Sequence, residues 1–248
     1  MVGEPGFLSS PDERTLRLTA KPLFGDPLAT TLADAIDIGL LGIELHTRRR
    51  NRVNGLVTAV SDHGFQVQVG QSFGNCPQYI QARMFELREN DARTKPIHPL
   101  TTFTEAEQDL ITKSDTFFIA TAYQDESAGA AKGVDVSHRG GKPGFVRIDD
   151  ELTLTIPDFA GNCHLNTFGN LEKNPHAGLL FVDFDRGYFL YLTGTAEVIW
   201  SGDEVSNYAG AERLLRFHLQ QGYRVEGSLL LCWSSPEFSR FLDKTGSW

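Results

Sequence analysis

The chain has 248 residues and a formal net charge of −9. Its length allows one large or two modest domains, and its acidic balance excludes a general nucleic-acid or membrane-surface binder, which would need a basic face. No stretch approaches the ~20 apolar residues of a membrane span. Met1 to Pro11 lacks a secretory signal, so we expect a cytoplasmic protein. Three cysteines and seven histidines lack metal-ligand spacing, so no metal site is expected.

The first part of the chain, residues 1–89, is predicted to form short strands joined by turns. Apolar and alternating runs predict strands within 7–18 and at 38–45, 53–60 and 65–69, with a short helix at 26–35. The last two strands flank Asp62-His63-Gly64, which is a strong hairpin signal.

Residues 90–102 are charged and then proline-containing, which predicts a linker. In residues 103–248, Thr104 and Glu107 have the spacing of a capping box, which predicts a helix that ends near Lys113. Strands are expected at 117–122, 134–136, 145–148, 152–156, 178–184, 188–200 and 228–233, and helices at 163–172, 204–221 and 236–243. Short strands with hairpin turns favour a mainly β, antiparallel barrel with few helices.

Part of the sequence occurs twice. Gly3-Glu4-Pro5-Gly6-Phe7 returns as Gly141-Lys142-Pro143-Gly144-Phe145. In nearly the same register, Gly39-Leu40-Leu41 returns as Gly178-Leu179-Leu180, and Gly55 returns as Gly194. The shared register predicts two copies of one structural unit, of which the first (1–89) begins mid-unit and the second is 103–248.

The second copy carries a set of motifs that resembles the pyridoxamine 5′-phosphate oxidase-like flavoproteins. The resemblance rests on Phe117–Thr121, Val134–Gly141, Pro143–Val146, Ile156-Pro157-Asp158, Gly161-Asn162, Asn166-Thr167, Gly169–Leu171, Asn174-Pro175 and Gly178–Phe181. Residues 47–55 and 71–80 look like the subgroup related to members fused to ferredoxin-reductase modules. The resemblance implies a tandem split β-barrel, FMN as cofactor and an oxidoreductase activity.

One departure from this family pattern bears on the substrate. Authentic pyridoxamine-phosphate oxidases carry a Ser-Arg-Lys run for the FMN phosphate before the short helix, where this chain has Leu165-Asn166-Thr167. The two cationic residues are missing. The chain is therefore not expected to be an authentic pyridoxamine-phosphate oxidase.

Three segments supply candidate cofactor-binding residues. The first is the cluster at the end of the 134–140 strand. Ser137 offers a hydroxyl, His138 a proton donor near neutral pH, Arg139 a guanidinium that can make two hydrogen bonds, and Gly140 close approach to the backbone. The predicted helix start offers unpaired N–H groups and neutral hydrogen-bond donors: Asn162, Asn166, Thr167 and Asn170. The basic run places Arg48 and Arg50 on one strand face, where they would supply charge that the second copy lacks.

Each candidate has a purely structural alternative. The first cluster is equally a polar strand end with a glycine turn, Asn162 is equally a helix cap, and the arginines are equally a solvated strand face. The sequence identifies no catalytic residue. Non-catalytic flavin binding or an interaction module, and a split barrel for haem or another planar cofactor, stay open as alternatives.

The expected partners follow from the resemblance. They are a small-molecule substrate and, as electron donor, a nicotinamide cofactor or a separate reductase, without nucleic acid or membrane. Split-barrel flavoproteins resemble one another in dimerising around FMN. We therefore expect either a homodimer or an intrachain pseudo-dimer in which the two copies pair, with FMN between them.

Overall fold

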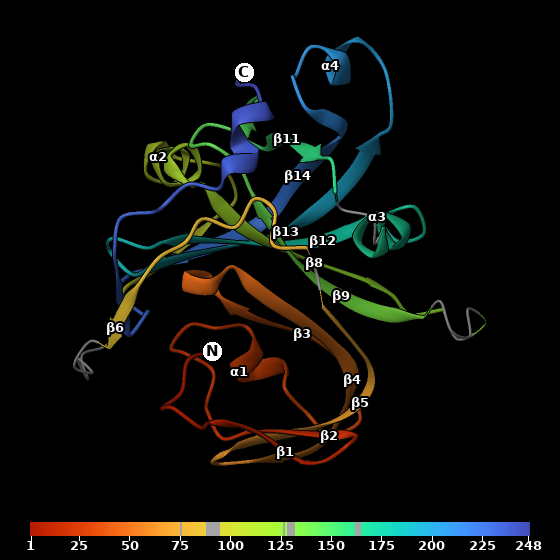
Figure 1. Ribbon diagram of the computed structural model, residues 1–248, viewed down its shortest axis with the longest axis vertical. Helices are drawn as coiled ribbons and strands as arrows, with labels where there is room; N and C mark the ends of the chain where they lie inside the picture. Colours follow the sequence, from red (N-terminus) through yellow and green to blue (C-terminus); the bar gives the residue numbers. More distant parts are fainter. Residues whose placement is uncertain (75, 88–94, 126, 128–131, 162–164) are drawn as a thin grey trace.

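The computed structural model describes residues 1–74, 76–87, 95–125, 127, 132–161 and 165–248. Most of the regular structure in these residues is β-strand, and the paired strands run antiparallel. The strands form two large sheets and one two-stranded sheet (Figure 1). This confirms the expected mainly β, antiparallel split-barrel class with short helices. No helix among the described residues is long and apolar enough to cross a membrane.

The N-terminal lobe is built on a five-stranded sheet in the order β1-β2-β5-β4-β3. Its strands are β1 (Leu8–Asp12), β2 (Thr15–Leu18), β3 (Asp37–Glu44), β4 (Arg49–Ser61) and β5 (Gly64–Gly74). The helix α1 (Leu28–Thr31) and the 3₁₀ turn η1 (Leu45–Thr47) lie between them. A small core of Leu18, Ile38, Val57, Phe65 and Val67 fills this lobe.

The C-terminal lobe is built on an eight-stranded sheet in the order β10-β11-β14-β13-β12-β8-β9, with β7 paired to β14. Its strands are β7 (Ile97–Leu100), β8 (Thr116–Tyr123), β9 (Gly133–Gly140), β10 (Arg147–Ile148), β11 (Thr153–Phe159), β12 (His176–Asp183), β13 (Tyr188–Ile199) and β14 (Ala211–Val225). Residues 97–100, placed in the linker by the sequence, thus form a strand of this lobe. The strands β6 (Phe85–Leu87) and β15 (Leu231–Trp233) pair with each other.

The larger hydrophobic core lies in the C-terminal lobe. Phe117 packs between Phe145 and Phe181, with ring centroids 5.9 and 5.2 Å away, and all three rings are buried. Each buried ring stabilises the fold by roughly 1.5–3 kcal/mol. The lobe that carries the family motifs therefore has its own core, separate from that of the N-terminal lobe.

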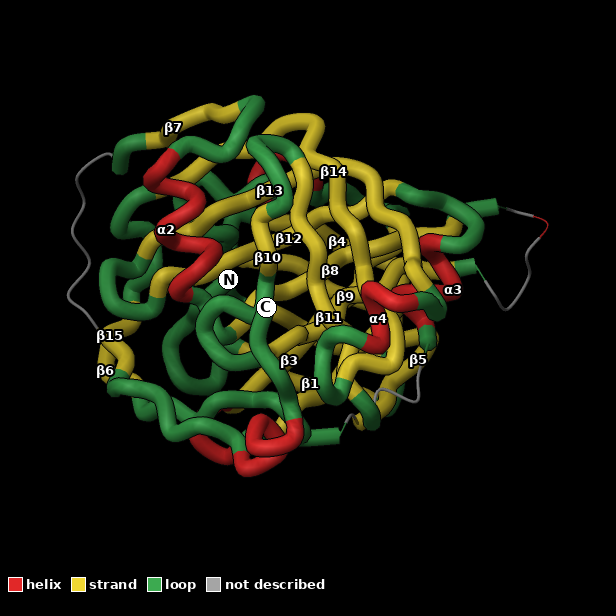
Figure 2. Tube along the Cα trace, turned by 90° about the horizontal axis from the view of Figure 1, so that it is seen from above, coloured by secondary structure: helices red, strands yellow, loops and turns green. Residues whose placement is uncertain are grey.

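The helices cap the ends of the eight-stranded sheet. Figure 2 shows α2 (Glu105–Lys113) at one end, with α3 (Asn166–Leu171) and α4 (Asp203–Ser206) at the other. The capping box at Thr104 and Glu107 is confirmed, and α2 ends at Lys113 as predicted. Glu107 also pairs with Arg224 on β14 at 2.9 Å, so the capping residue fastens the helix to the sheet.

The helix predicted at 204–221 is wrong. A four-residue helix, α4, is followed by Gly210 at φ +83° and then by the long strand β14. In β14 the buried Leu215, Phe217 and Leu219 alternate with more exposed residues, which is a period of two. Pairing with β11 and β13 on its two sides overrides the local helical pattern. The predicted terminal helix likewise shortens to the 3₁₀ turn η3 (Arg240–Lys244).

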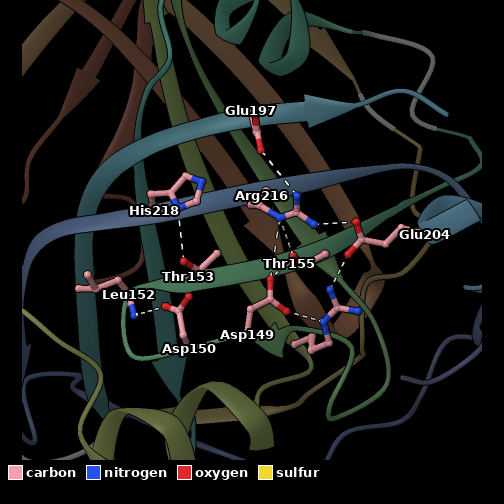
Figure 3. A network of polar contacts seen from close by, with 10 residues as sticks. Asp149, Asp150, Leu152, Thr153, Thr155, Glu197, Glu204, Arg216 and His218 are labelled. Atoms are coloured by element: carbon pink, nitrogen blue, oxygen red, sulfur yellow. Dashed lines mark hydrogen bonds and ion pairs between the residues drawn. The ribbon is translucent and has the colours of Figure 1, made fainter. Parts of the chain in front are cut away.

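The polar face of β14 carries a network of charges (Figure 3). Arg216 reaches Glu204 of α4 at 2.7 Å, Glu197 of β13 at 3.7 Å and Asp149 at 3.9 Å. Arg147 joins the same network through Asp149 and through Glu204 at 2.6 Å. The network ties α4 and the β10–β11 turn to the sheet at a partly exposed surface.

The two lobes share one hairpin register at the glycines that the sequence repeat pairs. Ile38 lies opposite Gly55 in the β3–β4 hairpin, and Ala177 lies opposite Gly194 in the β12–β13 hairpin. At each of these glycines the register of the next strand pair shifts. A Cβ atom on Gly55 would lie 2.2 Å from Gln68 O, and one on Gly194 would lie 2.0 Å from His218 O. Both positions therefore require glycine because of close backbone approach.

Replacement of these glycines tests that requirement. Gly55→Ala and Gly194→Ala should each lower the free energy of unfolding by about 1–3 kcal/mol, because the new methyl group collides with backbone. Gly42→Ala is the matched strand control, since its Cβ would have 3.9 Å to the nearest atom. Urea denaturation measures all three. Equal stability of Gly194→Ala and Gly42→Ala would contradict the assignment.

Candidate functional site

The two lobes meet where β3 and β4 pack against β9 (Figure 1). Arg52 of β4 and Asp135 of β9 form an ion pair at 2.7 Å, with side chains 1% and 2% exposed. The second carboxylate oxygen of Asp135 accepts hydrogen bonds from Thr167 (2.7 Å) and Ser137 (3.3 Å). One buried carboxylate therefore joins β4, β9 and α3.

Arg50 lies on the same face of β4, two residues before Arg52. Its Nε donates to Cys76 O and its Nη1 donates to His138 O, both at 3.1 Å. No carboxylate among the described residues pairs with it. Burial, together with the neighbouring Arg52 and Arg139 charges, lowers the pKa of Arg50 to about 10. A half-buried cation without a counter-charge is a favourable place for an anion.

His138 of β9 is 4% exposed and lies beside this guanidinium. Its Nε2 atom has no hydrogen-bond partner among the described residues. Burial, with Arg50, Arg139 and Arg83 nearby, holds the pKa of His138 well below its usual value of 6.5. The imidazole is therefore neutral at pH 7. It can offer a hydrogen bond there but not a positive charge.

Arg139 is engaged with other parts of the C-terminal lobe. Its guanidinium forms an ion pair with Asp158 of β11 and lies 4.9 Å from the ring centroid of Phe168. Asp158 also pairs with Arg213 at 2.8 Å. Asp158 is thus held between two arginines, which stabilise a carboxylate near the end of a fully buried strand.

A small hollow, partly open to solvent, lies between the two lobes beside these residues. The segment that precedes residue 80 contributes Cys76, Gln78 and Tyr79, and β4 contributes Arg50. The C-terminal lobe contributes His138, Arg139, Gly140, Pro157, Asp158, Phe159 and Gly161. The hollow is therefore lined from both parts of the chain, with the guanidinium of Arg50 on one side.

The structure brings four of the ten predicted cofactor-binding residues to this hollow: Arg50, His138, Arg139 and Gly140. Ser137 and Thr167 instead bind Asp135, and Asn170 donates to Thr121 Oγ1 at 3.2 Å. Arg48 binds Ile80 O and Glu237, so it anchors the chain rather than lining the hollow. Asn166 begins α3 and is half-buried. Asn162 lies outside the described residues.

Sequence reasoning did not select the β11 residues Pro157, Asp158 and Phe159 as part of the site. The available signal was Asp158, a carboxylate within the otherwise apolar and hydroxyl-bearing run Leu152–Phe159. A charge on a buried strand requires a partner. The partners, Arg139 and Arg213, are 19 and 55 residues away in sequence, so the sequence alone could not identify them.

The lobe-joining ion pair can be tested by unfolding. Asp135→Asn leaves Arg52 buried without its counter-charge, so we expect a loss of about 3–5 kcal/mol in the free energy of unfolding. Asp37→Asn is the matched control, because Asp37 and Lys132 also pair across the lobes, at 3.7 Å, but are partly exposed. That variant should lose no more than about 1 kcal/mol. Similar losses in urea titrations would refute the importance of the buried pair.

The depressed pKa of His138 predicts a pH dependence of stability. Below about pH 6.5 the unfolded chain binds a proton at His138, whereas the folded protein does not. The free energy of unfolding therefore falls as the pH falls. His138→Gln should remove up to about 1.4 kcal/mol per pH unit from that slope between pH 6.5 and 5. The exposed His63→Gln is the control for the substitution itself. Parallel slopes for wild type and His138→Gln would show that the histidine is protonated in the folded protein.

Comparison with known proteins gives one family match. The family model described as pyridoxamine 5′-phosphate oxidase matches residues 103–237, which is just over half of the chain. A search of curated proteins returned no match.

Several solved structures are similar to parts of the chain. HupZ from Group A Streptococcus has 17% identity and a TM-score of 0.39, over 55% of this chain and 98% of its own. A putative pyridoxamine 5′-phosphate oxidase from Lactobacillus delbrueckii has 15% identity and a TM-score of 0.39, over 50% and 94%. A Clostridium acetobutylicum protein related to general stress protein 26 has 16% identity and a TM-score of 0.35, over 52% and 92%.

Proposed function

The chain belongs to the pyridoxamine 5′-phosphate oxidase family, and we propose that it is an FMN-binding oxidoreductase of that family. FMN would be held in the hollow between the two lobes. The observation that carries this proposal is Arg50, a half-buried guanidinium that contacts only carbonyl groups among the described residues. It faces the family-matched lobe at His138, where the family motifs lie.

The residues present fit the phosphate end of FMN. A phosphate monoester carries about −1.5 to −2 charges at neutral pH and accepts charge-assisted hydrogen bonds. Arg50 offers the uncompensated charge, and His138 Nε2 is a buried polar atom without a partner among the described residues. Arg52 lies two residues further along β4. Its Nε and Nη2 atoms also have no hydrogen-bond partner among the residues that the structure describes. An anion beside these groups would relieve the repulsion among the arginines.

This arrangement supports a grip on FMN that differs from that of authentic pyridoxamine-phosphate oxidases. The neutral Thr167 stands where the family has a cation, and its hydroxyl is committed to Asp135. The positive charge would come from β4 of the N-terminal lobe instead. The chain is therefore proposed to act on a substrate other than the vitamin B6 phosphates.

The N-terminal lobe would take the place that a second subunit has in a dimer. The shared hairpin register and the matching register shifts at Gly55 and Gly194 support two related units in one chain. The buried Arg52–Asp135 pair supports a fixed contact between these units. FMN would then lie within one chain, at a pseudo-dimer interface.

Bound FMN would supply the electron-transfer chemistry, and the protein would supply binding and orientation. Arg50 and His138 would hold the phosphate, and β11 with the segment before Ile80 would surround the rest of the cofactor. The proposed reaction takes electrons from a reduced nicotinamide or a reductase and passes them to a small molecule or oxygen. The reaction class rests on the family, since no acid–base pair among the described residues points to another.

Loss of the Arg50 charge tests the proposal. Arg50→Gln should weaken FMN binding about 10–100-fold, because a hydrogen bond to a charged group contributes about 1.5–3 kcal/mol. Riboflavin, which lacks the phosphate, should bind wild type and variant alike. Arg49→Gln is the matched control, since Arg49 is exposed at the preceding position of the same strand. Quenching of flavin fluorescence measures each affinity.

Two results would contradict the proposed function. One is an Arg50→Gln variant that binds FMN as tightly as Arg49→Gln. The other is a wild-type protein that binds no flavin and shows, as purified, a Soret band instead of the two visible bands of an oxidised flavin. The second result would favour haem as the planar ligand.

A further inference from the structure

The ring of Tyr79 forms part of the wall of the hollow. The ring of Tyr79 packs against Phe159 of β11 with centroids 5.1 Å apart, and against Phe241 at 6.2 Å. Its hydroxyl donates to Ala160 O at 2.9 Å. An aromatic ring of the protein therefore already occupies the apolar side of the site, next to the cationic side formed by Arg50.

The backbone and the neighbouring side chain show that this position is unfavourable for the segment. Tyr79 has φ +63°, in the left-handed region that residues other than glycine rarely adopt. The Gln78 Oε1 atom is buried and has no partner among the described residues. Both features are the kind of local strain that persists where a site has a second state.

The C-terminal lobe is shaped to receive the segment closely. A Cβ atom on Gly140 would lie 2.0 Å from Tyr79 O, and one on Gly161 would lie 1.8 Å from Gln78 Oε1. Two glycines thus line the place where Gln78 and Tyr79 sit. Because neither glycine has a side chain, a flat ligand could also approach the backbone closely at both positions.

The chain is firmly anchored immediately after Tyr79. Ile80 is fully buried, and its carbonyl accepts a hydrogen bond from Arg48 Nε at 3.1 Å. Gln81 accepts a hydrogen bond from Ser239 N at 2.8 Å, and Ala82 pairs with Glu237 through two backbone hydrogen bonds. Cys76 and Pro77, on the other side, are exposed. Movement can therefore be confined to Gln78 and Tyr79, with Ile80 as the fixed end.

We propose that Gln78 and Tyr79 block the apolar side of the hollow, the ring slot between Phe159, Gly140 and Gly161. A planar ligand must displace these two residues before it binds. This rests on the proposed function and deepens it, because it adds a gate to the same site. Displacement uncovers the face of Phe159, the carbonyl of Ala160 and the backbone at Gly140 and Gly161. The cationic side at Arg50 stays in place, since β4 is fixed by the buried Arg52–Asp135 pair.

The uncovered groups define the class of ligand. The Ala160 carbonyl loses the hydroxyl hydrogen of Tyr79, so a good ligand returns an N–H or O–H donor at the edge of its ring. Phe159 favours a flat, apolar face, and Arg50 favours a negative tail. The slot therefore fits a planar heteroaromatic ring that carries an edge N–H donor and a phosphate. A flavin mononucleotide has all three features.

The gate predicts that removal of the ring tightens binding. Because the displaced state is the minor one in this proposal, Tyr79→Gly should bind both FMN and riboflavin at least about tenfold more tightly than wild type. Glycine also tolerates the positive φ of this position, so this variant keeps the backbone path. Tyr79→Phe keeps the ring and loses only the hydrogen bond to Ala160 O. It should therefore tighten binding by less than Tyr79→Gly.

The outcomes separate the gate from the proposed function. Equal or weaker flavin binding by Tyr79→Gly, with a wild type that binds, would overturn the gate and leave the flavin site standing. No binding by either protein would overturn both. Cys76 gives an independent readout, because it is an exposed free cysteine two residues before the moving pair Gln78 and Tyr79. FMN should change its alkylation rate by iodoacetamide several-fold, measured by mass spectrometry of the peptide, and an unchanged rate at saturating FMN would count against displacement.

Discussion

The arrangement of the two lobes depends on the buried ion pair between Arg52 and Asp135. Two charges removed from water are stable only when geometry and further hydrogen bonds satisfy them. Asp135 meets this condition through Arg52, Ser137 and Thr167, which belong to β4, β9 and α3. The lobes therefore cannot slide past each other without exposing or isolating a charge. This constraint also sets the position of Arg50, because side chains two residues apart on a strand share a face.

The same constraint explains how an acidic chain contains a positive hollow. The chain carries a net charge of −9, yet burial and then the nearby charges of Arg52 and Arg139 lower the pKa of Arg50. Asp135 and Asp158 compensate two of these arginines, and Arg50 is held by carbonyl oxygens. Burial, and after it the same arginine charges, lower the pKa of His138 and keep it neutral. The local potential, rather than the overall charge, thus favours an anionic ligand.

Local sequence signals predicted much of the fold and less of the site. The capping box at Thr104 and the hairpin at Asp62-His63-Gly64 are short-range patterns, and both elements form where expected. The 204–221 prediction is wrong because β14 owes its extended form to pairing with β11 and β13 on its two sides, which a local pattern does not reveal. Ser137 and Thr167 were expected to bind a cofactor. They serve Asp135 instead because Arg52, 83 residues away from that carboxylate, completes the cluster.

A tandem arrangement would also explain why the hollow is asymmetric. In a symmetric homodimer, both halves of an interface carry the same residues. In the register that relates Gly55 to Gly194, Arg50 and Arg52 correspond to Phe189 and Tyr191, which pack in an apolar cluster of the C-terminal lobe. One copy could then keep cations on this strand while the other used the same positions for packing. Two fused copies would be free to diverge in this way, and one chain would then build a single hollow from unlike halves.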